Sequence, residues 1–376
     1  MKRVKKFFLG LLIVFGVILL FAAGLFTYLT ITEYRPEPEE VVELYYLGDP
    51  EPTSRAKEPH WMVGYSAEEL PAADPSTFTV LSWNVGYCAL GEESDFFMDG
   101  GEEVRPEEEQ TILKNFEGVR DLLESTDVDF ILLQEVDSDS KRSYYKDEVT
   151  ELRDALGMAS AYAMNFSTNY VPYPWPPIGK VRSGLLTLSD HAISEATRIS
   201  LPCPFSWPVS MVNLKRCLLV TRTPIEGTDK ELVMVNLHLE AYDDGEGKLE
   251  QSRQLREFVE QEYAAGNYVI AGGDWNQIFP EAESAYPNTH MDLWTPGYLD
   301  PAELGEGWSY VWDVTTPTCR LLNQPYDPAD AANTQYYVID GFLVSPNVKV
   351  QSVQTLDEGF TYSDHNPVLL TVSLGE

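Results

Sequence analysis

The stretch from residue 231 to residue 276 decides the fold class, and it contains ELVMVNLHLE (231–240), GKLEQSRQLREFVEQEY (247–263) and YVIAGGDWN (268–276). The first and last of these segments contain short apolar runs, which predicts two strands. The middle segment repeats apolar residues at helical spacing. Its inward face is expected to carry Leu249, Leu255, Phe258 and Val259. A strand, a helix and a second strand in this order indicate an α/β domain.

Further strands are predicted on both sides of this stretch. They are FTVLSWNV (78–85), VDFILLQEV (128–136), LLTLS (185–189), CLLVTRTPI (217–225), YYVIDGFLVS (336–345) and NPVLLTVSL (366–374). A second helix is predicted over residues 107–126, where apolar residues again recur at helical spacing. Several neighbouring strands have no helix between them, so mixed sheets are favoured over one purely parallel sheet.

The composition of the chain excludes some classes of protein. The chain has 376 residues, of which 44% are hydrophobic and 12% aromatic, as in a packed globular protein. Its net charge is −34, which repels a polyanion at long range, so extended duplex nucleic acid is not an expected partner. The four cysteines form no CxxC pair, which argues against a zinc site. A disulfide between Cys203 and Cys217 and four free thiols are both compatible with the sequence.

The amino terminus predicts a membrane anchor. Basic residues in the first six positions precede 20 uncharged apolar residues, 7–26, which are enough to cross a bilayer as a helix. The positive-inside rule leaves the basic flank in the cytoplasm and the rest of the chain outside the cell. Small residues at 22–24 also suit a cleaved signal peptide, but the apolar region is long for one, and both alternatives export the domain.

Three regions are therefore expected. Residues 1–32 are predicted to be a cytoplasmic flank and single-pass signal-anchor in the cell membrane. Residues 33–74 are rich in proline and glutamate, which predicts a stalk. Residues 75–376 are predicted to be an extracellular catalytic domain.

Polar residues recur at the ends of the predicted apolar strands. They are Asn84, Glu135, Asn236, His238, Asp274, Asn276, Asp340, Asp364 and His365. Each alone has an ordinary structural explanation, such as a turn residue or a buried histidine with a hydrogen-bond partner. Together, carboxylates, amides and two histidines are the ligand set of a hard-cation site, for which Mg²⁺ is the usual ion.

The ordered series SWN, LLQEV, SGLLTLS, VNLHLE, GGDWN, YYVIDGFLVS and SDHNPV resembles the motif series of the endonuclease/exonuclease/phosphatase superfamily. The resemblance covers about residues 75–376. It implies a four-layered α/β sandwich of two packed mixed β-sheets flanked by helices, here preceded by one transmembrane helix. It also implies a Mg-dependent hydrolase acting on ester bonds of phosphate. In the motif GDxN, Trp275 stands where Phe or Leu is commoner, but no motif residue is missing.

The resemblance assigns a metal site to three residues. Glu135 is implied as the principal metal ligand, with Asn84 beside it and Asp364 as a further carboxylate. The expected ion is Mg²⁺, with Mn²⁺ or Ca²⁺ as alternatives, because these ions take oxygen ligands.

The resemblance assigns catalytic roles to five residues. Asp274 is implied to orient or deprotonate the attacking water, and Asn276 and His238 are implied to contact the scissile phosphate. His365 is implied to stabilise the transition state, and Asp340 is implied to hydrogen-bond His365 and hold it cationic. A carboxylate beside a histidine raises the pKa of its ring, which suits binding of a phosphate.

The substrate is left open by the sequence. Residues 163–184 are expected to form a loop over the site, and Arg182, Lys215 and Arg216 are candidate contacts of the substrate phosphate. So few cations cannot track a duplex, so a small or lipid phosphoester is favoured. The alternatives are an extracellular nuclease and a catalytically inactive surface binding protein. Monoesters and diesters are not distinguished, and the oligomeric state is not predicted.

Overall fold

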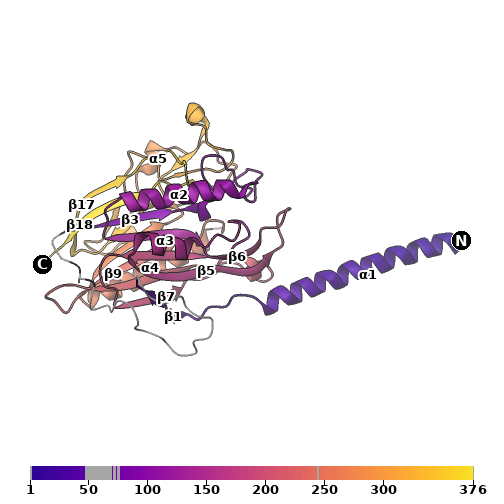
Figure 1. Cartoon of the computed structure of the whole chain (residues 1–376), viewed down its shortest axis with the longest axis horizontal. Helices are drawn as coiled ribbons and strands as arrows, with labels where there is room; N and C mark the ends of the chain where they lie inside the picture. Colours follow the sequence, from indigo (N-terminus) through magenta and orange to yellow (C-terminus); the bar gives the residue numbers. More distant parts are fainter. Residues whose placement is uncertain (1, 47–69, 71–72, 74–76, 244, 376) are drawn as a thin grey trace.

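Two seven-stranded mixed sheets pack face to face in the computed structural model, which describes residues 2–46, 70, 73, 77–243 and 245–375 (Figure 1). Sheet 1 has the order β1 (Glu39–Val41), β7 (Glu195–Ser200), β8 (Cys217–Pro224), β9 (Glu231–His238), β10 (Tyr268–Asp274), β16 (Asp340–Val344) and β13 (Ser309–Val311). Sheet 2 has the order β17 (Val348–Thr355), β18 (Val368–Leu374), β3 (Phe78–Asn84), β4 (Phe130–Asp137), β6 (Gly179–Ser189), β5 (Ala159–Val171) and β2 (Leu44–Tyr45). The pairs β9–β10 and β3–β4 are parallel, and the other pairs within these sheets are antiparallel.

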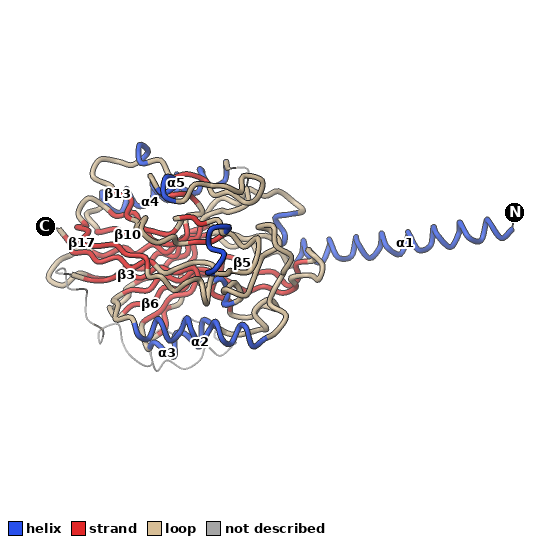
Figure 2. Tube along the Cα trace, turned by 90° about the horizontal axis from the view of Figure 1, so that it is seen from above, coloured by secondary structure: helices blue, strands red, loops and turns tan. Residues whose placement is uncertain are grey.

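Helices cover the outer faces of both sheets, which gives four layers (Figure 2). The helices α2 (Glu109–Ser125) and α3 (Glu148–Leu156) lie on sheet 2, and α4 (Glu246–Ala264) lies on sheet 1. In α2, Ile112, Phe116, Val119 and Leu123 form a buried stripe against the sheet. The predicted four-layered α/β sandwich is therefore confirmed.

Short elements complete the domain. They are η1 (Gly86–Cys88), η2 (Val209–Val212), β11 (Gln277–Ile278), α5 (Ala282–Ala285), β12 (Gly297–Tyr298), η3 (Pro301–Glu303), β14 (Cys319–Arg320), η4 (Pro328–Asn333) and β15 (Tyr336–Tyr337). The predicted strand 336–345 is thus divided into β15 and β16, with a break immediately before Asp340.

The interface between the sheets is largely apolar, and it contains a pair of buried amides near the site. Phe130 packs edge to face on Phe78, with ring centroids 5.8 Å apart, and both lie in the core between the sheets. Gln134 of sheet 2 donates from Nε2 to Oδ1 of Asn236 in sheet 1 at 2.8 Å. Asn236 donates in turn to the carbonyl oxygen of Leu133 at 3.1 Å. These hydrogen bonds fix how the two sheets lie against each other, because a slip would leave buried amides without partners.

The helix α4 differs from its prediction at one position. Leu255 and Val259 are buried as expected and Phe258 is half-buried, but Leu249 is 56% exposed. At about 100° per residue, Leu249 lies some 120° around the helix from Leu255, so it falls outside the inward stripe.

Residues 163–184 also differ from their prediction. They belong to a long hairpin of β5 and β6, and the connecting loop spans only residues 172–178. The residues on β5 alternate between buried and partly exposed, as in a strand with one face on the core.

None of the four cysteines forms a disulfide.

The segment predicted to be a stalk contributes to both sheets in its described part. β1 pairs with β7 at the edge of sheet 1, and β2 pairs with β5 at the edge of sheet 2. Residues 39–45 therefore connect the two sheets along one side of the sandwich. The predicted boundary between residues 74 and 75 lies outside the described residues.

The amino-terminal helix α1 (Lys2–Ile31) projects away from the sandwich (Figures 1 and 2). Residues Lys5–Ile31 form one helix that is long and apolar enough to cross a membrane, with a mean hydropathy of 2.8 over its most apolar window. At about 1.5 Å per residue, α1 is about 45 Å long, which exceeds the hydrocarbon thickness of a bilayer.

Candidate functional site

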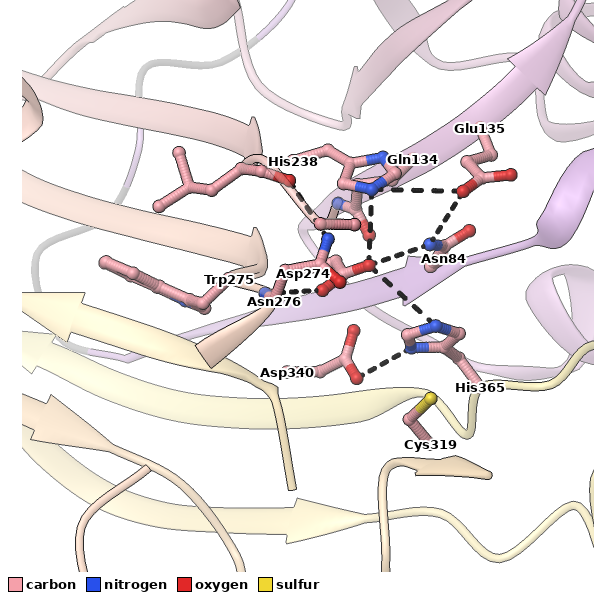
Figure 3. A network of polar contacts seen from close by, with 12 residues as sticks. Asn84, Gln134, Glu135, His238, Asp274, Trp275, Asn276, Cys319, Asp340 and His365 are labelled. Carbon is pink, nitrogen blue, oxygen red and sulfur yellow. Dashed lines mark hydrogen bonds and ion pairs between the residues drawn. The ribbon is translucent and has the colours of Figure 1, made fainter. Parts of the chain in front are cut away.

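Strand ends from both sheets meet at one end of the sandwich and carry most of the predicted site residues (Figure 3). On sheet 1, the register of β10 places Asp274 opposite His238 on the parallel strand β9 and opposite Asp340 on the antiparallel strand β16. Adjacent strands lie about 4.8 Å apart, so these three side chains are neighbours across the end of the sheet. Sheet 2 supplies Asn84 at the end of β3, Glu135 near the end of β4, and Asp364 and His365 directly before β18.

A β-bulge presents Glu135 to this site. The register between β4 and β6 shifts between Leu133 and Val136, and Glu135 has a φ of 56°. Leu133 and Val136 both pack into the core beneath α2, although strict alternation would send them to opposite faces. The bulge turns the backbone so that Glu135 leaves the face of the sheet and points into the site. A left-handed glutamate is uncommon and costs free energy, which the surrounding strands must offset.

Close backbone approach explains the glycine before Asp274. Gly273 has a φ of 150°, and a Cβ there would lie 1.9 Å from the carbonyl oxygen of Leu237. The backbone then enters the left-handed region at Asn276, with a φ of 51°, a conformation that asparagine tolerates. Trp275 between them is buried and donates from Nε1 to the carbonyl oxygen of Gly341 at 3.0 Å. The motif GGDWN is therefore a rigid turn that fixes Asp274 and Asn276.

His365 forms a buried pair with Asp340. Its Nδ1 lies 2.8 Å from Oδ2 of Asp340, which confirms the distance expected from the sequence. The indole of Trp83 donates to the carbonyl oxygen of His365 at 2.8 Å and holds the backbone. Burial alone would lower the pKa of His365, but the charges of Asp340 and Asp364 raise it well above its ordinary value. The contact with Asp340 therefore favours the imidazolium form of the ring.

Asp274 is the centre of the contacts in the site. Its Oδ2 accepts from Nδ2 of Asn84 at 3.0 Å, and it lies 3.4 Å from Nε2 of His238 and 3.8 Å from Nε2 of His365. Its Oδ1 accepts from the backbone N–H of Asn276 at 2.9 Å. Burial raises the pKa of Asp274 to about 6, and the charge of His365 opposes this rise.

The pKa of His238 is shifted in the opposite direction from that of His365. Burial lowers its pKa well below the ordinary value, and the positive charges of Arg216 and His365 add to the effect. Its Nδ1 is buried and has no hydrogen-bond partner among the described residues. Burial thus favours the neutral form of His238, whose Nε2 lies 3.4 Å from Oδ2 of Asp274 and 3.9 Å from Oε1 of Glu135.

The charge balance of the site fits a bound metal cation. Within the described part of the chain, no lysine or arginine lies within 4 Å of the carboxylates of Glu135, Asp274, Asp340 or Asp364, and only histidines pair with them. Burial and the charge of Glu135 raise the pKa of Asp364 to about 7, although His365 lowers it. Buried acids without a cation are costly, so a divalent ion would stabilise them. The oxygen donors of Glu135 and Asp364 suit Mg²⁺.

Asn84 lies beside this metal position. Its Nδ2 is 3.4 Å from Oε1 of Glu135, and its Oδ1 accepts from the backbone N–H of Gly86 at 3.0 Å. Two further groups of closely spaced donor atoms surround His365, one with Asp274 and Asp340 and one with Cys319 and Asp364. The first group already contains a carboxylate–imidazole pair, whereas the side-chain contacts of Glu135 and Asp364 are no shorter than 3.4 Å.

The three predicted substrate-binding cations are all held elsewhere by protein groups. Arg182 donates to the carbonyl oxygen of Thr168 at 2.7 Å and to Oδ1 of Asn169 at 2.6 Å, within its own hairpin. Arg216 is buried behind His238, where its Nη1 donates to the carbonyl oxygen of His238 at 3.2 Å.

Lys215 lies at the base of α1. Its Nζ is 3.0 Å from Oε1 of Glu33 and donates to the carbonyl oxygen of Ser210 at 2.7 Å. The described contacts of Lys215 and Arg182 therefore support the structure of the domain and do not reach the site.

A cation that the sequence did not reveal lies closer to the site. Arg142 pairs with Asp137 at 2.9 Å, and its guanidinium lies 3.5 Å from the centroid of the Tyr87 ring. Its charge also opposes the rise in the pKa of Glu135 that burial causes. Arg142 follows the loop after β4 and belongs to no motif, so only the three-dimensional fold brings it here.

A two-sheet α/β sandwich with histidines and carboxylates gathered at one end defines a class of phosphoester hydrolases. The chain matches the model of the endonuclease/exonuclease/phosphatase family over residues 81–365, and it therefore belongs to that family. No curated protein matches the chain.

Solved structures share the fold at low identity. An endonuclease/exonuclease/phosphatase from Beutenbergia cavernae DSM 12333 is 17% identical over 80% of this chain and 72% of its own, with a TM-score of 0.51. ANGEL2, a 2′,3′-cyclic phosphatase solved in complex with adenosine-2′,3′-vanadate, is 15% identical over 80% of this chain and 96% of its own, with a TM-score of 0.53. Both likenesses concern the fold.

Proposed function

We propose that this protein is a metal-dependent phosphoesterase that hydrolyses a phosphate monoester or diester by in-line attack of water. The observation that carries the proposal is the convergence of three buried acids, the partly exposed Glu135 and two buried histidines at the strand ends of both sheets. We further propose that α1 anchors the protein in the cell membrane with the catalytic domain outside. The substrate is then a small or lipid phosphoester.

Asn84, Glu135 and Asp364 would hold the metal ion. Mg²⁺ is the expected ion, with Mn²⁺ or Ca²⁺ as alternatives, because the donors are oxygens. When bound, the ion supplies positive charge for the phosphoryl oxygens.

Asp274 would act as the base that orients and deprotonates the attacking water. With a pKa of about 6, it is mostly ionised at neutral pH and is still basic enough to accept a proton. The hydrogen bond from Asn84 and the rigid turn at Asn276 fix the direction of its carboxylate.

His365 would stabilise the negative charge that develops on the phosphoryl oxygens. The ring is kept cationic by Asp340, so its charge is present before the reaction and needs no reorganisation. Asn276 and His238 would contact the same phosphate as neutral hydrogen-bond donors.

The proposal is tested with the full-length protein in detergent. Bis(p-nitrophenyl) phosphate, p-nitrophenyl phosphate and plasmid DNA are offered with Mg²⁺ and with a chelator. We expect hydrolysis of at least one aryl phosphate, its loss in the chelator and its return with added Mg²⁺. Undiminished hydrolysis in the chelator would contradict the metal dependence, and cleavage of DNA alone would favour a nuclease. Hydrolysis of none of the three would favour a binding protein.

A matched pair of variants guards against a contaminating enzyme. Asp274→Asn removes the proposed base, whereas Asp121→Asn removes an exposed acid on α2 that pairs with Arg120. Activity that survives in both variants at the wild-type level would not come from this site.

A further inference from the structure

Large apolar side chains are exposed where α1 meets the domain. Trp207 is 61% exposed and Val209 is 51% exposed, and both lie at the start of η2. The β5–β6 loop carries Tyr173, which is 71% exposed, and Trp175, which is 87% exposed. Burying such side chains away from water is favourable, so their exposure indicates a contact surface.

The η2 segment is packed directly on α1. The ring centroids of Trp207 and Phe26 are 6.0 Å apart, and Nε1 of Trp207 lies 3.4 Å from Oγ1 of Thr30. Thr30 also contacts Sδ of Met211 in η2 at 3.0 Å. The exposed face of η2 is therefore next to the last turns of the candidate membrane span.

The β5–β6 loop is joined to η2 through a small apolar cluster. Val171 and Val181 close the base of the loop and pack with Ile178, Val212 and Leu214. In both views the β5–β6 hairpin reaches out on the side of the domain where α1 leaves (Figures 1 and 2). The two exposed regions thus belong to one rigid face beside α1.

The strand ends that carry the site lie on this same side of the domain. Strand β18 begins beside His365 and runs to the C-terminus, which lies at the end of the domain opposite α1 (Figures 1 and 2). The strand ends that carry the site therefore face the α1 side. Tyr173 also stacks edge to face on Phe97, with centroids 6.0 Å apart, two residues before Asp99. Asp99 accepts from the hydroxyl of Tyr242 at 2.9 Å, a contact between two loops near the site.

We propose that Tyr173, Trp175, Trp207 and Val209 rest in the interfacial layer of the membrane that α1 enters and hold the strand ends that carry the site toward the bilayer. Tryptophan and tyrosine favour this layer because one part of the ring is apolar and another is polar. The net charge of −34 makes a surface of phosphatidylcholine, which is zwitterionic and has no net charge, the suitable partner, because anionic lipids would repel the domain. The proposal rests on the proposed phosphoesterase function in one respect, since it makes a lipid headgroup the source of the phosphoester.

The membrane contact is tested without any assay of activity. The full-length protein is placed in nanodiscs of phosphatidylcholine with brominated acyl chains, which quench tryptophan fluorescence at short range. Since α1 contains no tryptophan, quenching reports on the domain. We expect Trp175→Phe with Trp207→Phe to remove most of the bromine-dependent quenching. Trp308→Phe is the control, because it precedes β13, which lies far from α1 (Figure 2), and it should leave the quenching unchanged.

Unchanged quenching in the double variant would overturn the membrane contact, whatever the activity of the protein.

The source of the phosphoester is tested separately with phospholipid headgroups in the nanodisc and the same headgroups as soluble glycerol phosphodiesters. We expect faster hydrolysis of the membrane-borne form, and slower hydrolysis of that form alone in Trp175→Ser with Trp207→Ser. Equal or faster hydrolysis of the soluble form would overturn the lipid assignment. If the wild-type protein does not hydrolyse bis(p-nitrophenyl) phosphate, that result would instead count against the phosphoesterase function.

Discussion

His238 and His365 both lie beside the carboxylate of Asp274, and the surroundings shift the pKa values of the two rings in opposite directions. Their Nε2 atoms are 3.4 Å and 3.8 Å from Oδ2 of Asp274. His365 has a second acid, Asp340, at its other ring nitrogen, whereas His238 has a buried Nδ1 without a partner and Arg216 behind its backbone. The pKa of His365 is raised, and the pKa of His238 is lowered.

The comparison teaches that the partner of the second ring nitrogen decides what a buried histidine does. A carboxylate there keeps the ring cationic, which suits opposition to negative charge on a phosphoryl group. An apolar environment keeps the ring neutral, which leaves a hydrogen-bond donor without a charge. Two identical residues thereby take different chemical roles within one site.

The largest effect is expected at the carboxylate that the two rings share. Asp274→Asn removes the proposed base with almost no change in shape, so turnover should fall about a thousandfold or more. Steady-state kinetics on an aryl phosphate measure the loss, with Asp121→Asn as the control. A loss below about tenfold would show that Asp274 does not accept the proton.

The next largest effect is expected at the charged ring. His365→Ala should lower turnover about a hundredfold or more, and His365→Gln should do nearly the same because glutamine cannot carry the charge. Asp340→Asn should cost less, since the ring remains. The double variant of Asp340 and His365 should be no worse than His365→Ala, because both residues act through one group. Additive losses in this cycle would contradict the pair.

A smaller effect is expected at the neutral ring. His238→Ala should lower turnover about tenfold, the equivalent of a hydrogen bond worth about 1.5 kcal/mol. His238→Gln should recover much of the loss, because an amide also donates without a charge. The difference in rescue between the two glutamine variants is the sharpest kinetic test. Equal rescue at both positions would mean that the rings do not differ in charge.

The smallest effect is a difference in titration. In metal-free protein, side-chain NMR should show His365 losing its proton above the ordinary pKa of about 6.5, and His238 gaining one only below it. The raised pKa of His365 contributes stability that is fully present below about pH 6.5 and is lost as the pH rises through the folded value. The lowered pKa of His238 makes stability fall as the pH drops below about 6.5. Asp340→Asn should move the midpoint of His365 downward and leave that of His238 nearly unchanged.

The elements of the core were predictable because their signals are local. The strands β4, β8, β9 and β10 are continuous apolar runs, and α2 and α4 repeat apolar residues at helical spacing. Residues 163–184 of the β5–β6 hairpin were predicted to be a loop because the aromatics and prolines at 172–178 dominate the pattern. The edge strands β1 and β2 lie in a proline- and glutamate-rich segment, and only pairing with the sheets orders them.

The central acids and histidines of the site were also predictable, since each stands at a strand end within a recognisable motif. Charged groups outside the motifs were not. Lys215 was taken for a substrate contact but pairs with Glu33, 182 residues away in sequence. Arg142 was missed although its charge acts on Glu135. Long charged side chains choose partners across the fold, and a sequence gives no distance between them.

The position of β18 in sheet 2 has a consequence for synthesis of the protein. The strand pairs with β3, whose sequence lies almost three hundred residues earlier, and His365 directly precedes it. Until residues 364–374 leave the ribosome, β3 has one unpaired edge and the site lacks both Asp364 and His365. The nascent chain therefore cannot assemble the complete site until β18 is inserted beside β3.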